Sequence, residues 1–125
     1  MGTKILGLRT TIYKTNNIIK AKEWYAKAFQ TEPYFDEPFY VGFNIGGYEL
    51  GLQPEETPLL KSDAVVSYWG VADIMEQYEH FLNLGATSHE APQNVGGEIV
   101  VATLKDPWNN VIGLIYNPEF KVEQV

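Results

Sequence analysis

The sequence contains no cysteine and only two histidines, His80 and His89, and these scarcities rule out or weaken several kinds of chemistry. Without cysteine the chain can form no disulfide and can offer no thiolate as a nucleophile or metal ligand. It also lacks a Gly-x-Ser-x-Gly elbow, a phosphate-binding loop, a dinucleotide-binding glycine fingerprint and a His-Glu-x-x-His motif. No motif therefore supports a nucleotide-dependent enzyme or a zinc protease. We expect both histidines to lie at the surface.

Basic residues are scarce as well. Nine lysines and arginines stand against 16 acidic residues, so the net charge is -7. Such a chain is repelled by nucleic acids and by anionic membrane surfaces. No stretch approaches 18 consecutive apolar residues, and the first residues lack the apolar core of a secretory signal. We therefore expect a cytoplasmic protein with no nucleic-acid partner and no membrane partner.

What the chain does have is 45% hydrophobic residues arranged with clear periodicity. Apolar residues at helical spacing predict one helix over residues 18–29 and a second over 73–84, where Asp73 and Glu76 form a capping box. Gly85 is suited to the left-handed position after the second helix. Strands are predicted at 5–15, 35–45, 48–53, 65–71, 87–91, 98–104 and 111–116, with Pro38 marking an edge or a bulge.

The same design occurs twice along the chain. Leu50-Gly51-Leu52 follows a Gly46-Gly47 turn, and Ile112-Gly113-Leu114 follows a turn at Asn109-Asn110. Each half reads as a strand, a helix and three strands. We predict a single domain over residues 1–125, built from a repeat at 5–53 and 64–117 with a Pro-rich linker at 54–63. Because each half is too thin to bury both of its faces, the two sheets should curl around a shared cavity.

Two further patterns point to a known family. The first helix carries Asn17-Ile18-x-x-Ala21-x-x-Trp24-Tyr25, and the last turn carries Asp106-Pro107-x-Asn109-Asn110-x-Ile112. With the repeated order, these patterns resemble the vicinal oxygen chelate superfamily, which includes glyoxalase, bleomycin-resistance and extradiol-dioxygenase-like proteins. The resemblance implies an α+β fold of two tandem βαβββ modules with mixed sheets. It also implies a homodimer, but not one activity, because the superfamily holds lyases, dioxygenases, epimerases, thiol transferases and drug-sequestering proteins.

The resemblance also implies where a metal would be bound. Metal-dependent relatives place a ligand on the first and on the last strand of each half, and here these positions hold Thr10, Gly51, Val66 and Gly113. None of these side chains is a nitrogen or carboxylate ligand. We therefore expect no metal and no other cofactor. A displaced site made by Glu49, His89 and Glu98 stays open.

Strand alternation selects the candidate ligand-binding residues. Side chains of the same parity as Gly51 and Gly113 should face the cavity. The candidates are Thr10, Ile12, Glu49, Gln53, Tyr68, Glu98 and Ile115. The missing side chains of the two glycines leave volume for a ligand or water, unless a large aromatic residue packs over each glycine. The same alternation directs Arg9 toward a helix, so either the register is shifted by one residue or Arg9 pairs at a subunit interface.

These observations lead to three functional hypotheses. The first is a metal-independent protein that binds and sequesters a small apolar or aromatic ligand, for which the acidic surface also suits a cation. The second is an enzyme, either a glyoxalase-like or dioxygenase-like one with relocated metal ligands or a metal-free catalyst. In the metal-free case Glu49 would be the general base, with a pKa raised by burial. The third is an interaction or regulatory module with a vestigial cavity.

Overall fold

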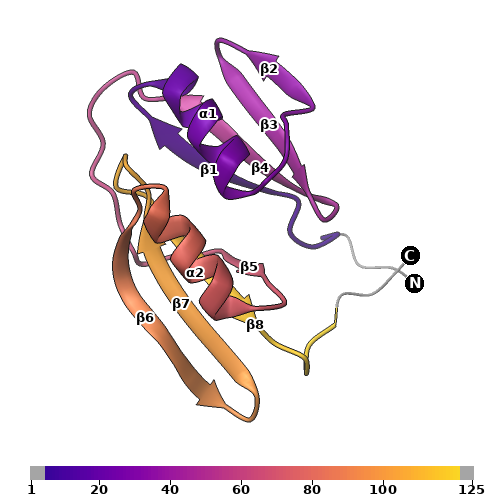
Figure 1. Cartoon of the computed structure of the whole chain (residues 1–125). Coiled ribbons are helices and arrows are strands. Elements are labelled where there is room, and N and C mark those ends of the chain that lie inside the picture. The colour runs from indigo at the N-terminus through magenta and orange to yellow at the C-terminus, as the bar shows by residue number, and fades with distance from the viewer. Residues whose placement is uncertain (1–4, 122–125) are drawn as a thin grey trace. The chain divides into compact units, whose positions relative to one another are not determined.

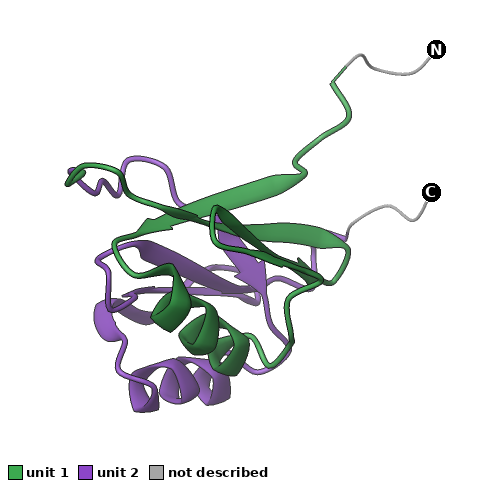
Figure 2. Ribbon diagram, turned by 90° about the horizontal axis from the view of Figure 1, so that it is seen from above, with its two compact units in different colours: residues 1–59 green, residues 60–125 purple. Residues whose placement is uncertain are grey.

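The structure, a computed structural model, describes residues 5–121. The chain divides into two compact units, residues 1–59 and 60–125 (Figure 2). The boundary lies within the predicted linker, although Pro54 still belongs to a strand. Each unit consists of a strand, a helix and three further strands in that order (Figure 1), which confirms the predicted βαβββ repeat. The shared cavity stays a prediction.

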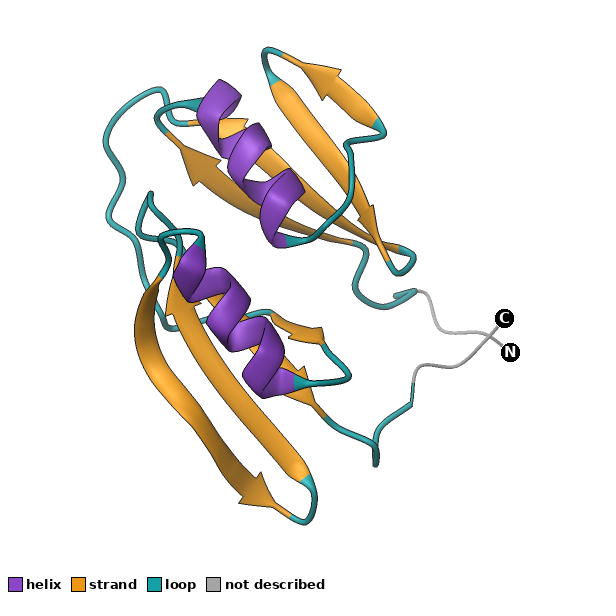
Figure 3. Ribbon diagram, viewed as in Figure 1, coloured by secondary structure: helices purple, strands orange, loops and turns teal. Residues whose placement is uncertain are grey.

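Unit 1 is a four-stranded mixed sheet with one helix on one face (Figure 3). Its elements are β1 (Thr10–Thr15), α1 (Ile18–Ala28), β2 (Phe35–Glu37), β3 (Tyr40–Ile45) and β4 (Tyr48–Pro54). The strand order is β1-β4-β3-β2, in which β1 runs parallel to β4 and the other pairs are antiparallel. The parallel pair is possible because α1 and the following strands carry the chain back across the sheet.

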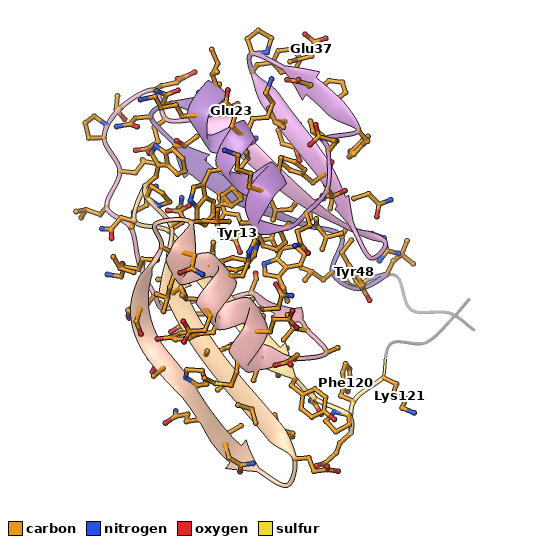
Figure 4. All side chains as sticks on the ribbon, in the orientation of Figure 1. Tyr13, Glu23, Glu37, Tyr48, Phe120 and Lys121 are labelled. Carbon is orange, nitrogen blue, oxygen red and sulfur yellow. The ribbon has the colours of Figure 1, made fainter. Side chains whose placement is uncertain are left out.

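The core of unit 1 lies between α1 and the sheet. Tyr25 of α1 is buried and stacks on Tyr13 of β1, which is labelled in Figure 4, with ring centroids 5.5 Å apart. The sheet contributes mainly aliphatic side chains to this core, and they alternate along the strands: Val41, Phe43, Leu50 and Leu52. Burying a side chain of this size contributes about 1.5–3 kcal/mol. This packing defines which side chains of the sheet face α1.

Unit 2 repeats the arrangement with its own core. Its elements are β5 (Tyr68–Gly70), α2 (Ile74–Asn83), β6 (Thr87–Gly96), β7 (Ile99–Lys105) and β8 (Val111–Tyr116). The strand order is β5-β8-β7-β6, with β5 parallel to β8. The buried face combines α2 with the two central strands and contains Ile74, Tyr78, Phe81, Ala102, Leu104, Ile112 and Leu114. The predicted bounds of β8 are confirmed.

The predicted helix starts are confirmed by their caps. The side chains of Asn17 and Asp73 accept hydrogen bonds from the backbone N–H groups of Lys20 and Glu76, each at 3.1 Å. Gly85 adopts a φ of 99° after α2, as predicted. The first helix ends one residue earlier than predicted, because Gln30 already adopts a left-handed φ of 54°. Within residues 5–121 no helix is long and apolar enough to span a membrane.

The first predicted strand begins later than the sequence suggests. Residues 5–9 lie outside β1, and the side chains of Ile5, Leu6 and Leu8 are exposed. Gly7 has a φ of 98°, which interrupts the extended backbone. Arg9 is exposed, and its Nη1 donates to the carbonyl of Leu6 at 2.9 Å. Because Arg9 precedes the strand, the expected conflict between its charge and a helix does not arise.

Three other strand predictions also need correction. Residues 35–45 form two strands, because Pro38 lies in a turn between β2 and β3 and lacks the N–H that a ladder needs. The strand predicted at 65–71 shortens to three residues, since only Tyr68–Gly70 pair with β8. The strand predicted at 87–91 extends to Gly96 with register shifts. It was underestimated because β6 is a mostly exposed edge strand without an apolar alternation.

The turn before β8 is organised by one buried carboxylate. Asp106 is only 5% exposed, and its Oδ1 accepts from the N–H groups of Trp108 at 2.9 Å and Asn110 at 2.8 Å. Its Oδ2 accepts from the side-chain amide of Asn110 at 2.9 Å. Asn109, between them, has a left-handed φ of 71°. The predicted turn at Asn109-Asn110 is therefore confirmed, and Asp106 holds it closed.

We predict that Asp106→Ala destabilises the protein by roughly 1–3 kcal/mol, because it removes the acceptor for these turn donors. Urea denaturation measures the change. The matched control is Asn109→Gly, which places the residue best suited to a positive φ in the same turn and should be neutral or slightly stabilising. Equal loss of stability in both variants would contradict this role of Asp106.

Candidate functional site

The register of unit 1 assigns each strand residue to one face of the sheet. Because Tyr13, Leu50 and Leu52 pack against α1, their sequence neighbours point to the opposite face, which we call the distal face of unit 1. The pairs Thr10 with Glu49 and Ile12 with Gly51 lie side by side on it. Gln53 lies on the same face, opposite Lys14. The structure thus brings together the four unit 1 candidates, Thr10, Ile12, Glu49 and Gln53.

Glu49 is the centre of a hydrogen-bond cluster on this face. The hydroxyl of Thr10, on the neighbouring parallel strand, donates to Oε1 of Glu49 at 2.7 Å. The hydroxyl of Tyr34 donates to Oε2, and the hydroxyl of Tyr40 also donates to the carboxylate. Tyr34 is positioned by its backbone N–H, which donates to the carbonyl of Gly42 at 2.9 Å. Side chains from β1, β3 and the segment before β2 therefore converge on one carboxylate of β4.

Sequence reasoning did not include Tyr34 or Tyr40 among the site residues. Treating residues 35–45 as one strand left Tyr34 without a place in the sheet. The structure pairs Glu37 with Tyr40 and Val41 with Leu52, so Tyr40 has the parity of the distal face. A turn at Pro38 was the one local signal that could have placed both tyrosines beside β4.

The cluster shifts the pKa values of its members in opposite directions. Hydrogen bonds from Tyr34 and Thr10 lower the pKa of Glu49 below its ordinary 4.5, against the opposing effect of burial. Burial and the hydrogen bond to Glu49 raise the pKa of Tyr40 to about 12. The pKa of Tyr34 is also raised, first by its hydrogen bond to Glu49. Glu49 is therefore ionised at neutral pH, and both phenols are neutral.

This result corrects one prediction about Glu49. The metal-free enzyme hypothesis needed burial to raise the pKa of its carboxyl toward neutrality. The structure shows the opposite direction, because the hydroxyl donors stabilise the charged form more than burial destabilises it. A carboxylate with a lowered pKa is a weak proton acceptor at neutral pH. The chemistry that Glu49 can perform is therefore to hold a negative charge.

The glycines of the closing strands are both covered by tyrosine rings. A Cβ added to Gly51 would lie 2.7 Å from Cζ of Tyr40, and one added to Gly113 would lie 2.6 Å from Cδ1 of Tyr68. Of the two alternatives for these glycines, the aromatic cover is the one that the structure shows. Gly113 also allows the carbonyl of Ser67 to approach, since an added Cβ would lie 2.8 Å from that oxygen.

Unit 2 holds the remaining candidates, but not all on one surface. Tyr68 pairs with Gly113, and Gly70 pairs with Ile115, so Tyr68 and Ile115 both lie on the sheet face opposite α2. Glu98 lies in the exposed hairpin turn between β6 and β7 rather than within a strand. Its predicted place on the face of the sheet is therefore wrong, because β7 begins only at Ile99.

His89 is less exposed than expected for a surface residue. Its side chain is 25% exposed, and its Nδ1 lies 2.9 Å from Oγ1 of the buried Thr103. Its Nε2 lies 3.3 Å from a carboxylate oxygen of Asp63. The hydroxyl of Thr103 donates to Glu90 at 3.0 Å. These contacts attach Asp63, at the end of the predicted linker, to the sheet of unit 2.

The positions that would carry metal ligands do not fit a resident metal. The two closing-strand positions are glycines under tyrosine rings, and the first-strand positions hold Thr10 and Val66. Among residues 5–121 no three His, Asp or Glu side chains gather closely enough to bind a metal ion. The displaced site is not supported either, because His89 lies near the start of the long strand β6 and Glu98 lies in the turn beyond its end.

The geometry of the two units defines the class of fold. Each unit is a four-stranded mixed sheet with a parallel pair and one helix, and the order βαβββ occurs twice. This is the α+β fold of the glyoxalase and bleomycin-resistance proteins, as the sequence patterns predict. No protein-family model matches the chain, and the comparison with curated proteins finds no match.

Solved structures give the particular likenesses. A glyoxalase-related enzyme from Fulvimarina pelagi matches with a TM-score of 0.77 at 11% identity, over 95% of this chain and 94% of the other. A glyoxalase/bleomycin resistance protein/dioxygenase family enzyme from Burkholderia phytofirmans matches with a TM-score of 0.72 at 18% identity, over 86% of this chain and 95% of the other. A fosfomycin resistance protein from Mesorhizobium loti matches with a TM-score of 0.72 at 17% identity, over 92% of this chain and 95% of the other. These likenesses show the glyoxalase and bleomycin-resistance fold.

We predict that a side chain is destabilising at both closing-strand glycines, but that removal of the covering tyrosine relieves the conflict only at Gly51. Gly51→Ala and Gly113→Ala should each cost roughly 1–3 kcal/mol of stability through overpacking. In the double variant Gly51→Ala/Tyr40→Ala the steric conflict disappears. Its loss of stability should therefore be smaller than the sum of the losses in the two single variants. The double variant Gly113→Ala/Tyr68→Ala keeps the conflict with the Ser67 carbonyl, so its loss of stability should be close to the sum of the two single losses. Urea denaturation of the six variants tests this, and equal coupling in both pairs would contradict it.

We predict a pH dependence of stability with opposite signs at the two ends of the range. The stabilisation from Tyr40 is complete below its ordinary pKa of 10.0 and is lost as pH rises toward about 12. The stabilisation from Glu49 is complete above pH 4.5, its ordinary pKa, and is lost as pH falls through the lowered pKa of the folded state. Thermal unfolding across pH should therefore show a flatter alkaline limb for Tyr40→Phe and a flatter acid limb for Glu49→Gln. Limbs unchanged by these variants would contradict the assignment.

Proposed function

We propose that this protein is a metal-independent binding protein for a small organic cation with an apolar or aromatic body. The observation that carries the proposal is the ionised carboxylate of Glu49 on the distal face of unit 1, held by Thr10 and Tyr34. A carboxylate that needs no rearrangement to receive a positive charge lowers the free-energy cost of binding. The net charge of -7 would favour the approach of a cation.

An aromatic surface adjoins this carboxylate. Phe35 lies on β2 with its ring centroid 6.2 Å from that of Tyr40 and 6.1 Å from that of Phe39. Tyr34 continues the group, 6.5 Å from Phe35. Tyr34 and Phe39 are 64% and 65% exposed. A polar anchor beside apolar aromatic side chains is the composition of sites for small organic ligands. These rings would pack against the apolar body of the ligand.

Binding is favoured over catalysis by the protonation states of the cluster. General acid–base catalysis needs a group that exchanges a proton near the working pH. Here Glu49 titrates below its ordinary value and Tyr40 at about 12, so neither exchanges protons readily at neutral pH. The homodimer and the cytoplasmic location stay predictions.

The proposal predicts thermal stabilisation by small aromatic amines. A ligand at 100 times its Kd stabilises the folded chain by about 2.7 kcal/mol. Glu49→Gln should weaken binding at least roughly tenfold, because a charge-assisted interaction contributes about 1.5–3 kcal/mol. Calorimetric titration measures the affinity.

The matched control is Glu23→Gln, which changes the net charge equally on the exposed surface of α1 (Figure 4) and should bind as the parent does. If both substitutions weakened binding equally, the effect would come from the overall charge of the protein and not from Glu49. A stoichiometric divalent ion in protein purified without chelator, or no stabilisation by any aromatic amine, would overturn the proposed function.

A further inference from the structure

We infer that the Glu49 cluster selects cations that carry N–H donors, such as a primary ammonium or an amidinium, over fully alkylated ammonium ions. The inference rests on the proposed function and names the ligand class for the same site. It follows from where the hydroxyl protons of the cluster point. Charge alone attracts both kinds of cation equally, so the preference has to come from hydrogen bonding.

Each hydroxyl of the cluster has a single proton, and each proton is already used. Thr10 donates its proton to Oε1 of Glu49 at 2.7 Å, and Tyr34 donates its proton to Oε2. Tyr40 also donates to the same carboxylate. A hydroxyl whose proton is used can still accept a hydrogen bond through its lone pairs, but cannot donate one. The three hydroxyls therefore present only acceptors to an incoming ligand.

The carboxylate itself keeps some capacity to accept. Two carboxylate oxygens offer about four lone-pair positions, and three hydroxyl donors leave about one of them for a ligand. The whole cluster is thus a patch of acceptors that carries a negative charge. An N–H group of a cation satisfies these acceptors, whereas a methyl group in the same place removes water from them without replacing its hydrogen bonds.

Other polar groups near the patch do not change this. Asn44 is paired opposite Glu49, and its side-chain amide is held at the β3–β4 turn, where Oδ1 accepts from the N–H of Gly47 at 2.8 Å. Arg9 precedes Thr10, and its guanidinium donates to the carbonyls of Leu6 and Leu8. Lys14 lies four residues along β1 from Thr10, about 13 Å away at the usual rise of a strand.

The arrangement of the tyrosines also differs from an aromatic cage. A cage for quaternary ammonium ions presents ring faces to the charge. Here Tyr34 and Tyr40 direct their hydroxyl ends toward Glu49, so a cation beside the carboxylate meets oxygen atoms rather than ring faces. This geometry favours a cation that can donate hydrogen bonds.

The test compares benzylammonium with benzyltrimethylammonium, which share the charge and the aromatic ring and differ only in N–H donors. Calorimetric titration of the unmodified protein at pH 7 should give a benzylammonium affinity roughly 10–100-fold higher, since hydrogen bonds to charged groups contribute that much. Benzamidinium should bind in the same range as benzylammonium. Benzoate, which offers only acceptors and a like charge, should show no binding.

A variant checks that the preference comes from the cluster. In Glu49→Gln the side-chain amide no longer accepts from all three hydroxyls, so the ratio between the two ammonium ions should fall toward one, while Glu23→Gln keeps the parent ratio. Circular dichroism confirms that the variants fold. Equal affinities for the two ammonium ions in the unmodified protein, or tighter binding of the trimethyl ion, would overturn this inference and leave the proposed function intact. Absence of binding by every aromatic cation would instead refute the proposed function.

Discussion

The negative charge of Glu49 is stabilised by three hydroxyl groups that come from separate parts of unit 1. The carboxylate is stabilised by Thr10 from β1, Tyr34 from the segment before β2 and Tyr40 from β3, while Glu49 itself lies on β4. The same hydrogen bonds lower the pKa of the carboxyl and raise those of the phenols. The electrostatic character of the distal face, its suitability for a cation and its unsuitability for proton transfer all follow from this one arrangement.

The second constraint is steric, and it occurs in both units. A tyrosine ring lies over the glycine in the middle of each closing strand, Tyr40 over Gly51 and Tyr68 over Gly113. Since a glycine has no side chain, the ring can pack directly on the backbone. Where the resemblance implies metal ligands in some relatives, this chain has aromatic packing. Both units thus have a glycine at this point of the closing strand and a tyrosine ring packed over it.

The likeness to solved structures concerns this backbone design. TM-scores of 0.72–0.77 at identities of 11–18% show the same fold with mostly different side chains. Fold alone does not define an activity, because function depends on the groups placed on it. For this chain those groups are a carboxylate, hydroxyls and aromatic rings on one sheet face of unit 1. They are the reason to consider ligand binding before catalysis.

Patterns within a few residues were enough to predict both helices, their caps at Asn17 and Asp73, the last turn and the parity of Thr10, Ile12, Glu49 and Gln53. These features depend on neighbours close in the chain, which a sequence displays directly. Three outcomes needed tertiary structure: the partners of Glu49, the rings that cover the glycines and the exposed position of Glu98. They depend on which strands pair and in which register, and on a turn at Pro38 that brings Tyr34 back beside β3. Pairing between distant segments is decided by packing of the whole sheet against its helix, and apart from the turn signal at Pro38 no local pattern records it.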